Sequence, residues 1–127
     1  MITIYDKRGF TKLVELDTIT FNGADFSHKD LTDANFVQMD LRSCKLNHAT
    51  LIRADLRLTR LNNADFTGAN LEDADFSGAN LTGAVFTDAK LQRTNFNDAT
   101  VHLMGLNTLI EQGIDVEKIK IAPETGA

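Results

Sequence analysis

The sequence is poor in the residues that many folds use for their cores and crosslinks. Its 127 residues include no tryptophan, one tyrosine, one proline and one cysteine. The single cysteine, Cys44, excludes an intramolecular disulfide, so a reducing cytoplasm is the expected compartment. No stretch approaches the roughly 18 consecutive apolar residues of a membrane-spanning helix, and the start lacks the apolar run of a signal peptide. We therefore expect a cytoplasmic protein without membrane contact.

A basic surface is also missing from this sequence. The formal net charge is −5 and the isoelectric point is about 5.0. Duplex binding requires a basic stripe that releases counterions from phosphates, so direct nucleic-acid binding is not expected. The length suits one domain and is too short for two independent cores.

The sequence does contain a five-residue repeat that runs from Phe21 to Val101 without insertion or deletion. Seventeen positions share this phase, here called centres, and they hold seven phenylalanines, nine leucines and Val101. Alanine lies two residues before a centre eleven times, and the position between them is aspartate or asparagine ten times. A helix repeats its apolar face every 3.6 residues and a strand every 2, so neither explains a period of five.

A chain that turns once every five residues explains this period. The centre and the residue two before it then point inward, while the other three residues face water. Four such segments close a square, so twenty residues make one coil. The position two after a centre is often Gly, Asn or Asp, which tolerate the positive φ of a type II turn. Four residues tolerate it less well, and we expect a different turn type at Gln38, Arg53, Leu58 and Arg93.

The clearest units are residues 64–83, which read ADFTG-ANLED-ADFSG-ANLTG. This pattern resembles the pentapeptide-repeat family, and the match extends over residues 19–103. The resemblance implies an all-β fold, a right-handed quadrilateral β-helix of about four coils formed by residues 20–103.

The flanks of the repeat are expected to cover its two open ends. Residues 1–19 are predicted to form a short extended N-terminal cap, where the large Ile19 replaces the small alanine. Residues 104–121 are predicted to form a small helical C-terminal cap, followed by a tail at 122–127. Asn107 is expected to begin the helix and Gly113 to end it. Residues 116–121 are typical of a brief strand or a second helical turn.

No catalytic, metal-binding or cofactor-binding residue is predicted. His28 and His48 are twenty residues apart, which places them on adjacent coils about 5 Å apart. Two imidazoles there could hold a divalent metal, but no third ligand is evident and the inward-phase Cys44 suits a small core residue. The carboxylates recur with the repeat on flat sides, without a cleft or a nucleophile with its base.

Two surfaces are candidates for protein contacts. Val37, Gln38, Arg57 and Leu58 form the first, a small patch where two apolar side chains face solvent on adjacent coils. The C-terminal residues Leu106, Leu109 and Ile110 form the second, where self-association gives a C-terminal homodimer as the alternative to a monomer. The column Asp33, Arg53, Asp73, Arg93 alternates in sign and predicts a ladder of surface ion pairs.

These features predict a non-enzymatic protein-binding or scaffolding module, of bacterial origin, with an unknown protein partner. The resemblance implies one alternative, because some pentapeptide-repeat proteins mimic duplex DNA and inhibit or protect DNA gyrase. Residues 20–101 hold eleven acidic and eight basic residues, a net of three negative charges with both signs interspersed. That charge is weak support for DNA mimicry.

Overall fold

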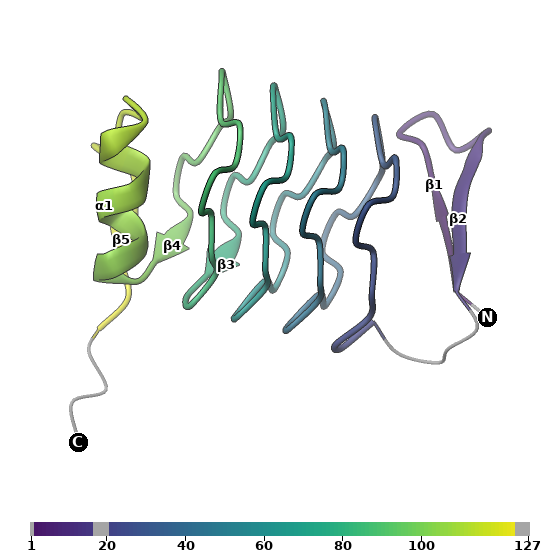
Figure 1. Ribbon diagram of the computed structural model, residues 1–127, viewed down its shortest axis with the longest axis horizontal. Coiled ribbons are helices and arrows are strands. Elements are labelled where there is room, and N and C mark those ends of the chain that lie inside the picture. The colour runs from purple at the N-terminus through teal and green to yellow at the C-terminus, as the bar shows by residue number, and fades with distance from the viewer. Residues whose placement is uncertain (1, 17–20, 124–127) are drawn as a thin grey trace.

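Residues twenty apart lie side by side in the computed structural model, which describes residues 2–16 and 21–123 (Figure 1). Parallel bridges join successive coils in four ladders, which start at Asp25, Asp30, Asn35 and Asp40. Among the described residues, regular strands occur only in the last of these ladders. It includes β3 (Asn80–Leu81), β4 (Thr100–Val101) and β5 (Lys120–Ile121), which form a parallel three-stranded sheet. Elsewhere each segment bends too soon to form a longer strand.

The centres of the repeat form the core, as the five-residue phase predicts. Every centre from Phe26 to Val101 is at most 3% exposed. Phenylalanine rings stack along the axis, with centroids 5.1 Å apart for Phe66 and Phe86 and 5.2 Å apart for Phe76 and Phe96. The two stacks meet edge to face across the interior, where Phe66 and Phe76 are 5.5 Å apart. This arrangement fills the coil without tryptophan, because offset and T-shaped ring pairs pack closely.

The Asp or Asn before a centre closes a local turn. Its side-chain oxygen accepts a hydrogen bond from the backbone N–H two residues later, at 2.9–3.2 Å. This contact fixes the backbone around each centre and explains why short side chains with an oxygen recur there. All ten such residues form it: Asp25, Asp30, Asn35, Asp40, Asp55, Asp65, Asn70, Asp75, Asn80 and Asn95.

Because carboxylates accept the hydrogen bonds of these turns, we expect the stability of the protein to fall at acidic pH. The hydroxyls and backbone N–H groups of Ser27 and Thr32 hold the pKa values of Asp25 and Asp30 below the ordinary 3.8. Because the folded pKa is lowered, this stabilisation is present above pH 3.8 and is lost as the pH falls through the folded pKa. The double variant Asp25→Asn/Asp30→Asn keeps the acceptors without the titration.

We expect that variant to melt within about 3 °C of the wild type at pH 7 and to lose less stability on acidification, measured by thermal melts from pH 7 to 2. Asn80 shows that asparagine accepts the same bond in this fold, from Thr82 N–H at 3.1 Å. An equal loss of melting temperature in both proteins would contradict a role for these two carboxylates.

The corners of the coils are all alike, which corrects one prediction from the sequence. Gln38, Arg53, Leu58 and Arg93 have φ of 62°, 58°, 58° and 57°, the same left-handed conformation as the glycine corners. The prediction of a different turn type at these residues is wrong. The N–H groups of Gln38 and Leu58 each donate to a carbonyl of the next coil at 3.0 Å. These hydrogen bonds between coils form only when the corners have the same conformation. Their stabilisation outweighs the cost of the left-handed conformation, about 1–2 kcal/mol per residue.

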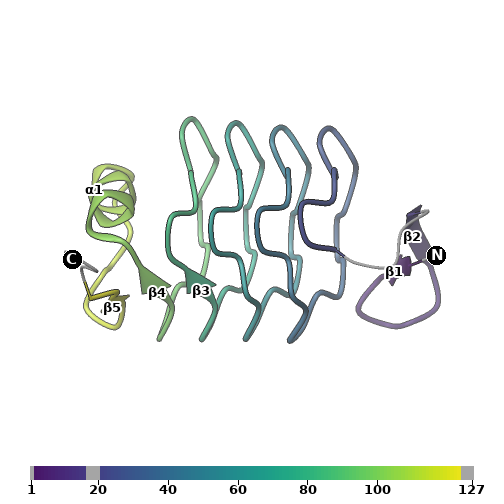
Figure 2. The same cartoon turned by 90° about the horizontal axis from the view of Figure 1, so that it is seen from below.

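A β-hairpin lies beside the first coil at the N-terminal end (Figure 2). Strands β1 (Ile2–Tyr5) and β2 (Lys12–Leu16) pair antiparallel, and Ile4 is fully buried. Asp6 bridges to Ala34 in the first coil. The extended conformation predicted for residues 1–19 is therefore present in both strands, whereas Ile19 lies outside the described residues.

The C-terminal end begins with helix α1 (Leu103–Glu111). His102 is its N-cap, because its Nδ1 accepts a hydrogen bond from Met104 N–H at 3.3 Å. Asn107 lies inside the helix, so the prediction that it begins the helix is wrong. Gly113 has a φ of +79° and follows the last helical turn, as the sequence predicts. Leu109 is fully buried, and Gln112 Nε2 donates to the carbonyl of Ala89 at 2.9 Å.

The five-residue phase resumes after the helix, which the sequence reading missed. β5 pairs in parallel with β4, so Lys120 lies beside Thr100 and Ile121 beside Val101. Asp115 accepts from Glu117 N–H at 2.9 Å, which repeats the turn contact of the coils. Helix α1 thus replaces about half of one further coil. The brief strand predicted within residues 116–121 is present, whereas residues 124–127 of the predicted tail lie outside the described residues.

Candidate functional site

A groove of about 750 Å³ runs along one corner of the coils. It crosses several coils, because residues far apart in the sequence stack in columns at this corner. Apolar, hydroxyl and charged side chains all contribute to it. Its lining residues, here called the corner groove, are Val37, Arg57, Leu58, Ser77, Gly78, Asp98, Thr100 and Lys120.

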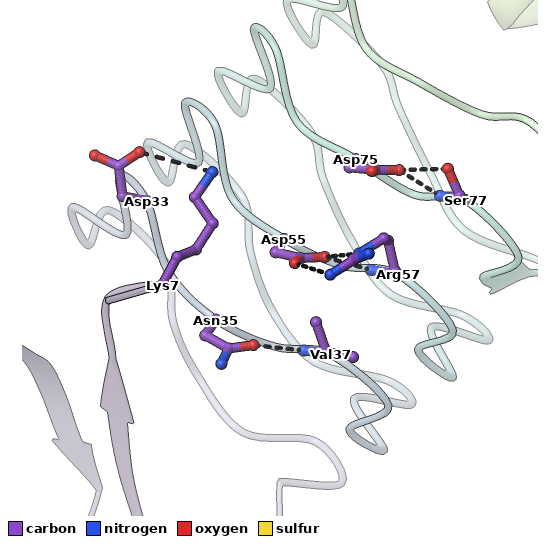
Figure 3. A network of polar contacts seen from close by, with 8 residues as sticks. All are labelled: Lys7, Asp33, Asn35, Val37, Asp55, Arg57, Asp75 and Ser77. Atoms are coloured by element: carbon purple, nitrogen blue, oxygen red, sulfur yellow. Dashed lines mark hydrogen bonds and ion pairs between the residues drawn. The ribbon is translucent and has the colours of Figure 1, made fainter. Parts of the chain in front are cut away.

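Arg57 is held against the side of this groove by the turn contact that recurs in each coil (Figure 3). Asp55 accepts from the backbone N–H of Arg57 at 3.2 Å and from its guanidinium at 2.8 Å through both carboxylate oxygens. Burial raises the pKa of Asp55, but these hydrogen bonds outweigh it and hold that pKa below its usual value. The pair is therefore charged at neutral pH, and the aliphatic stem of Arg57 stays in place.

Leu58 and Gly78 give the groove its shape. Leu58 is 55% exposed and lies on the corner one coil before Gly78. A Cβ at position 78 would come within 2.7 Å of Leu58 Cδ2, so the leucine side chain lies over the glycine. His48 and Asn63 cover Gly68 and Gly83 in the same way. The missing side chain at Gly78 therefore lets Leu58 reach over this corner, and Asp98 is the next residue of the same column.

Gly78→Ala is expected to destabilise the protein more than Gly23→Ala. Both glycines have positive φ, +70° and +74°, but nothing lies within 4 Å of a Cβ at Gly23. The extra cost at Gly78 is about 0.5–1.5 kcal/mol, because Leu58 has to leave its preferred rotamer. In a Leu58→Ala background this difference should disappear, as thermal melts of the four variants would measure. A difference that persists would place Leu58 away from Gly78.

The far end of the groove carries one anion and one cation. Asp98 and Lys120 form no ion pair with any other residue that the structure describes. Lys120 reaches this place because β5 continues the ladder beyond Thr100. The groove therefore combines an exposed apolar side chain with two charged side chains that form no ion pair within the described residues and can pair with a ligand. That combination suits an extended polypeptide better than a small apolar ligand.

The structure brings together three of the four residues predicted as a partner contact. Val37, Arg57 and Leu58 line the groove, whereas Gln38 is exposed but does not line it. Sequence reasoning missed the other five lining residues. The twenty-residue wrap carries the signal for Gly78 and Asp98, since both continue the column of Leu58. Predicting Lys120 would have required knowing that the five-residue phase resumes after the helix.

The ion-pair ladder predicted from the sequence is confirmed in part, because the described residues form two separate pairs in this column and none between Arg53 and Asp73. Arg53 donates to Asp33 from Nε at 2.9 Å and from a terminal nitrogen at 3.1 Å. Arg93 forms the same two-bonded contact with Asp73, at 2.7 and 3.1 Å. Each hydrogen bond from arginine lowers the pKa of its aspartate. These pairs are exposed and contribute register more than stability.

The histidine pair is stacked, as its spacing predicts. The rings of His28 and His48 lie 5.2 Å apart at an angle of 14°. Within residues 2–16 and 21–123, no three side chains of the His, Cys, Asp or Glu type gather as metal ligands.

No helix in the described part of the chain has both the length and the apolar character needed to cross a bilayer. Cys44 is buried, and that burial raises its pKa to about 11.

The residues predicted for self-association are not equivalent. Leu109 is fully buried against the last coil and is unavailable to a partner, which corrects the prediction for this residue. Leu106 is partly buried, while Ile110 is 50% exposed. Helical geometry explains the difference, because neighbouring residues such as 109 and 110 point about 100° apart. The other large apolar side chains exposed at this end are Leu103, Met104 and Ile121.

The chain matches a protein-family model described as "Pentapeptide repeats (8 copies)" over residues 20–57 and 59–98. A search of solved structures finds a pentapeptide repeat protein from the thylakoid lumen of Arabidopsis thaliana at 32% identity and a TM-score of 0.50. That match covers 65% of this chain and 53% of the plant protein, so this chain spans about half of that relative's length.

The same search finds two further solved structures. A pentapeptide repeat protein from Nostoc is 29% identical with a TM-score of 0.35, over 77% of this chain and 84% of that one. QnrB1, a plasmid-mediated fluoroquinolone resistance protein, is 18% identical with a TM-score of 0.34, over 81% of this chain and 62% of that one. No curated protein sequence matches significantly. The family match gives the fold as a right-handed β-helix.

Proposed function

Because the chain belongs to the pentapeptide-repeat family, we propose that it is a non-enzymatic protein-binding or scaffolding module that uses the corner groove. The observation that carries this proposal is the groove itself, where Leu58 is exposed beside Asp98 and Lys120. The stacked ladders hold this surface rigid before binding, which reduces the entropy lost on association.

Selection from a displayed library of random peptides tests this function. We expect selected peptides to combine an apolar residue with charged residues that complement Asp98 and Lys120. Leu58→Ser should weaken their binding at least tenfold, because it removes the apolar wall of the groove. Val85→Ser is the matched control, since Val85 is an exposed apolar residue, at 43%, outside the groove. Peptides that bind Leu58→Ser as tightly as wild type would contradict the groove as the contact surface.

Inhibition or protection of DNA gyrase by DNA mimicry is the alternative function. The ion-pair ladder weighs against it, because Arg53 and Arg93 alternate with Asp33 and Asp73 along the axis. Duplex DNA presents an unbroken negative charge along its axis. We expect the purified protein to leave gyrase supercoiling unchanged, with and without a quinolone. Protection or inhibition in that assay would favour the alternative.

We further propose about four coils for the repeat, with the hairpin and the C-terminal segment acting as caps.

A homodimer through the C-terminal end is proposed as the alternative to a monomer, through Ile110 with Leu103, Met104 and Ile121. Light scattering of the wild type and of Met104→Asp separates these states, because Met104 is 73% exposed. The cytoplasmic location and bacterial origin stay predictions; the similar plant protein comes from the thylakoid lumen.

A further inference from the structure

The loop between β1 and β2 is fixed by one carboxylate. Asp6 Oδ1 accepts from the backbone N–H groups of Phe10 at 3.0 Å and Thr11 at 3.2 Å. The backbone adds two bonds of 2.9 Å, from Asp6 N–H to the carbonyl of Thr11 and from Gly9 N–H to the carbonyl of Asp6. The hydrogen bond from Thr11 holds the pKa of Asp6 below its usual value. The loop therefore has a defined shape at neutral pH.

The same hairpin is anchored to the first coil. Lys7 N–H donates to the carbonyl of Asp33 at 2.8 Å, and Asn35 N–H donates to the carbonyl of Tyr5 at 2.9 Å. The side chains of Lys7 and Asp33 add an ion pair of 4.0 Å (Figure 3). Whatever the loop presents is thus held in a fixed position relative to the coils.

This rigid loop presents a phenylalanine to solvent. Phe10 is 80% exposed, whereas the phenylalanine centres from Phe26 onward are buried. The guanidinium of Arg8 lies 5.6 Å from the centre of the Phe10 ring. Neither side chain packs in the core, so the fold gives no reason for a large aromatic residue at this position. An ordered, exposed Arg and Phe pair has the composition of a binding hot spot.

The charge around Phe10 is opposite to that of the whole chain. Lys7, Arg8 and Lys12 face only Asp6 within residues 6–12, a local net charge of +2 in a chain of −5. Lys7 and Lys12 each lie near a carboxylate, Asp33 and Glu15 respectively. Arg8 has no ion pair with a described residue. Arg8 is thus the cation of this loop that has no ion pair among the described residues, and a surface that fits the loop carries an anion opposite it.

We propose that the hairpin loop is a second binding surface, in which Phe10 inserts into an apolar pocket of a partner protein whose rim is acidic and pairs with Arg8. A protein pocket fits this loop better than a bilayer. One buried aromatic side chain can anchor a protein interface. Stable attachment to a membrane needs more apolar surface, and outside this loop the chain carries a net charge of −7, which repels anionic lipids.

The test uses the full chain with the photoreactive analogue p-benzoylphenylalanine at position 10, irradiated in the cells that encode it. We expect a protein adduct that is lost when Arg8→Glu is introduced. The captured protein, purified and titrated by calorimetry, should bind Phe10→Ser at least thirtyfold more weakly than wild type and Phe10→Tyr nearly as well. Arg8→Glu should weaken binding at least tenfold and remove most of its dependence on salt.

Further variants distinguish binding at the hairpin loop from binding at the corner groove. Leu58→Ser should leave the affinity of this partner unchanged, because Leu58 belongs to the corner groove. The exposed Phe10 and Arg8 variants should melt like the wild type, so weaker binding cannot come from unfolding. No adduct, adducts with lipid or with a second copy of the chain only, or full affinity in Phe10→Ser would each overturn the proposal.

Discussion

Phe76→Asp is expected to prevent folding. Phe76 is fully buried, stacks on Phe96 at 5.2 Å and meets Phe66 edge to face at 5.5 Å. The substitution removes these contacts and a third with Phe86, and it places a carboxylate in a core where no described buried residue is a cation. The free energy of unfolding should fall by at least about 4 kcal/mol, a large share of the stability of a small domain. Circular dichroism and thermal melting measure this result.

The control for Phe76→Asp needs an outward residue that makes no turn contact. Ser77 is unsuitable, because both its backbone N–H and its hydroxyl donate to Asp75, and a second carboxylate there would repel the first. Thr87 is exposed, and the residue before its centre is Val85, which has no carboxylate. Thr87→Asp should therefore melt within about 3 °C of the wild type. If Phe76→Asp melts as high as this control, the inward phase is wrongly assigned.

Leu109→Asp is expected to open the C-terminal end and cause aggregation. Leu109 is the buried residue of α1, and it packs against the last coil. A charge at this place should lower the free energy of unfolding by at least about 3 kcal/mol and release the helix. The exposed ladder edge and core would then be free to associate with other copies. Thermal melting and light scattering report the two effects.

The next residue supplies a matched control. Ile110 is 50% exposed, so Ile110→Asp should leave the melting temperature of the monomer within about 3 °C of the wild type and cause no aggregation. Should the two variants behave alike, the helix would not cover the core through Leu109.

The sequence predicted the inward residues well, because their pattern is strictly local. A centre such as Phe66 is buried for the same reason as Phe86, since the wrap puts identical phases on the same side. The ion pair of Arg53 with Asp33 followed from a spacing of twenty. The ends were predicted less well. Asn107 has a side chain typical of a helix cap, yet His102 caps α1, because the last coil fixes where the chain leaves the ladder.

The candidate site was predicted only in part, for a related reason. The twenty-residue wrap supplied Arg57 and Leu58 from neighbouring columns. It did not supply Lys120, which joins the groove only because helix α1 replaces part of a coil and the chain then re-enters the ladder. The exposed Phe10 was missed altogether, since nothing in its local sequence distinguishes an aromatic residue in a loop from one in a core.

By itself, the sequence determined the repeat, its inward side chains and its stacked columns, because a period of five without interruption specifies the same local turn many times. Tertiary structure decided what lies between the columns. The uniform left-handed corners at Gln38 and Leu58 came from hydrogen bonds between coils, which outweigh the local preference of each residue. The groove and the position of the hairpin likewise depend on contacts between residues distant in sequence, and no local pattern encodes those contacts.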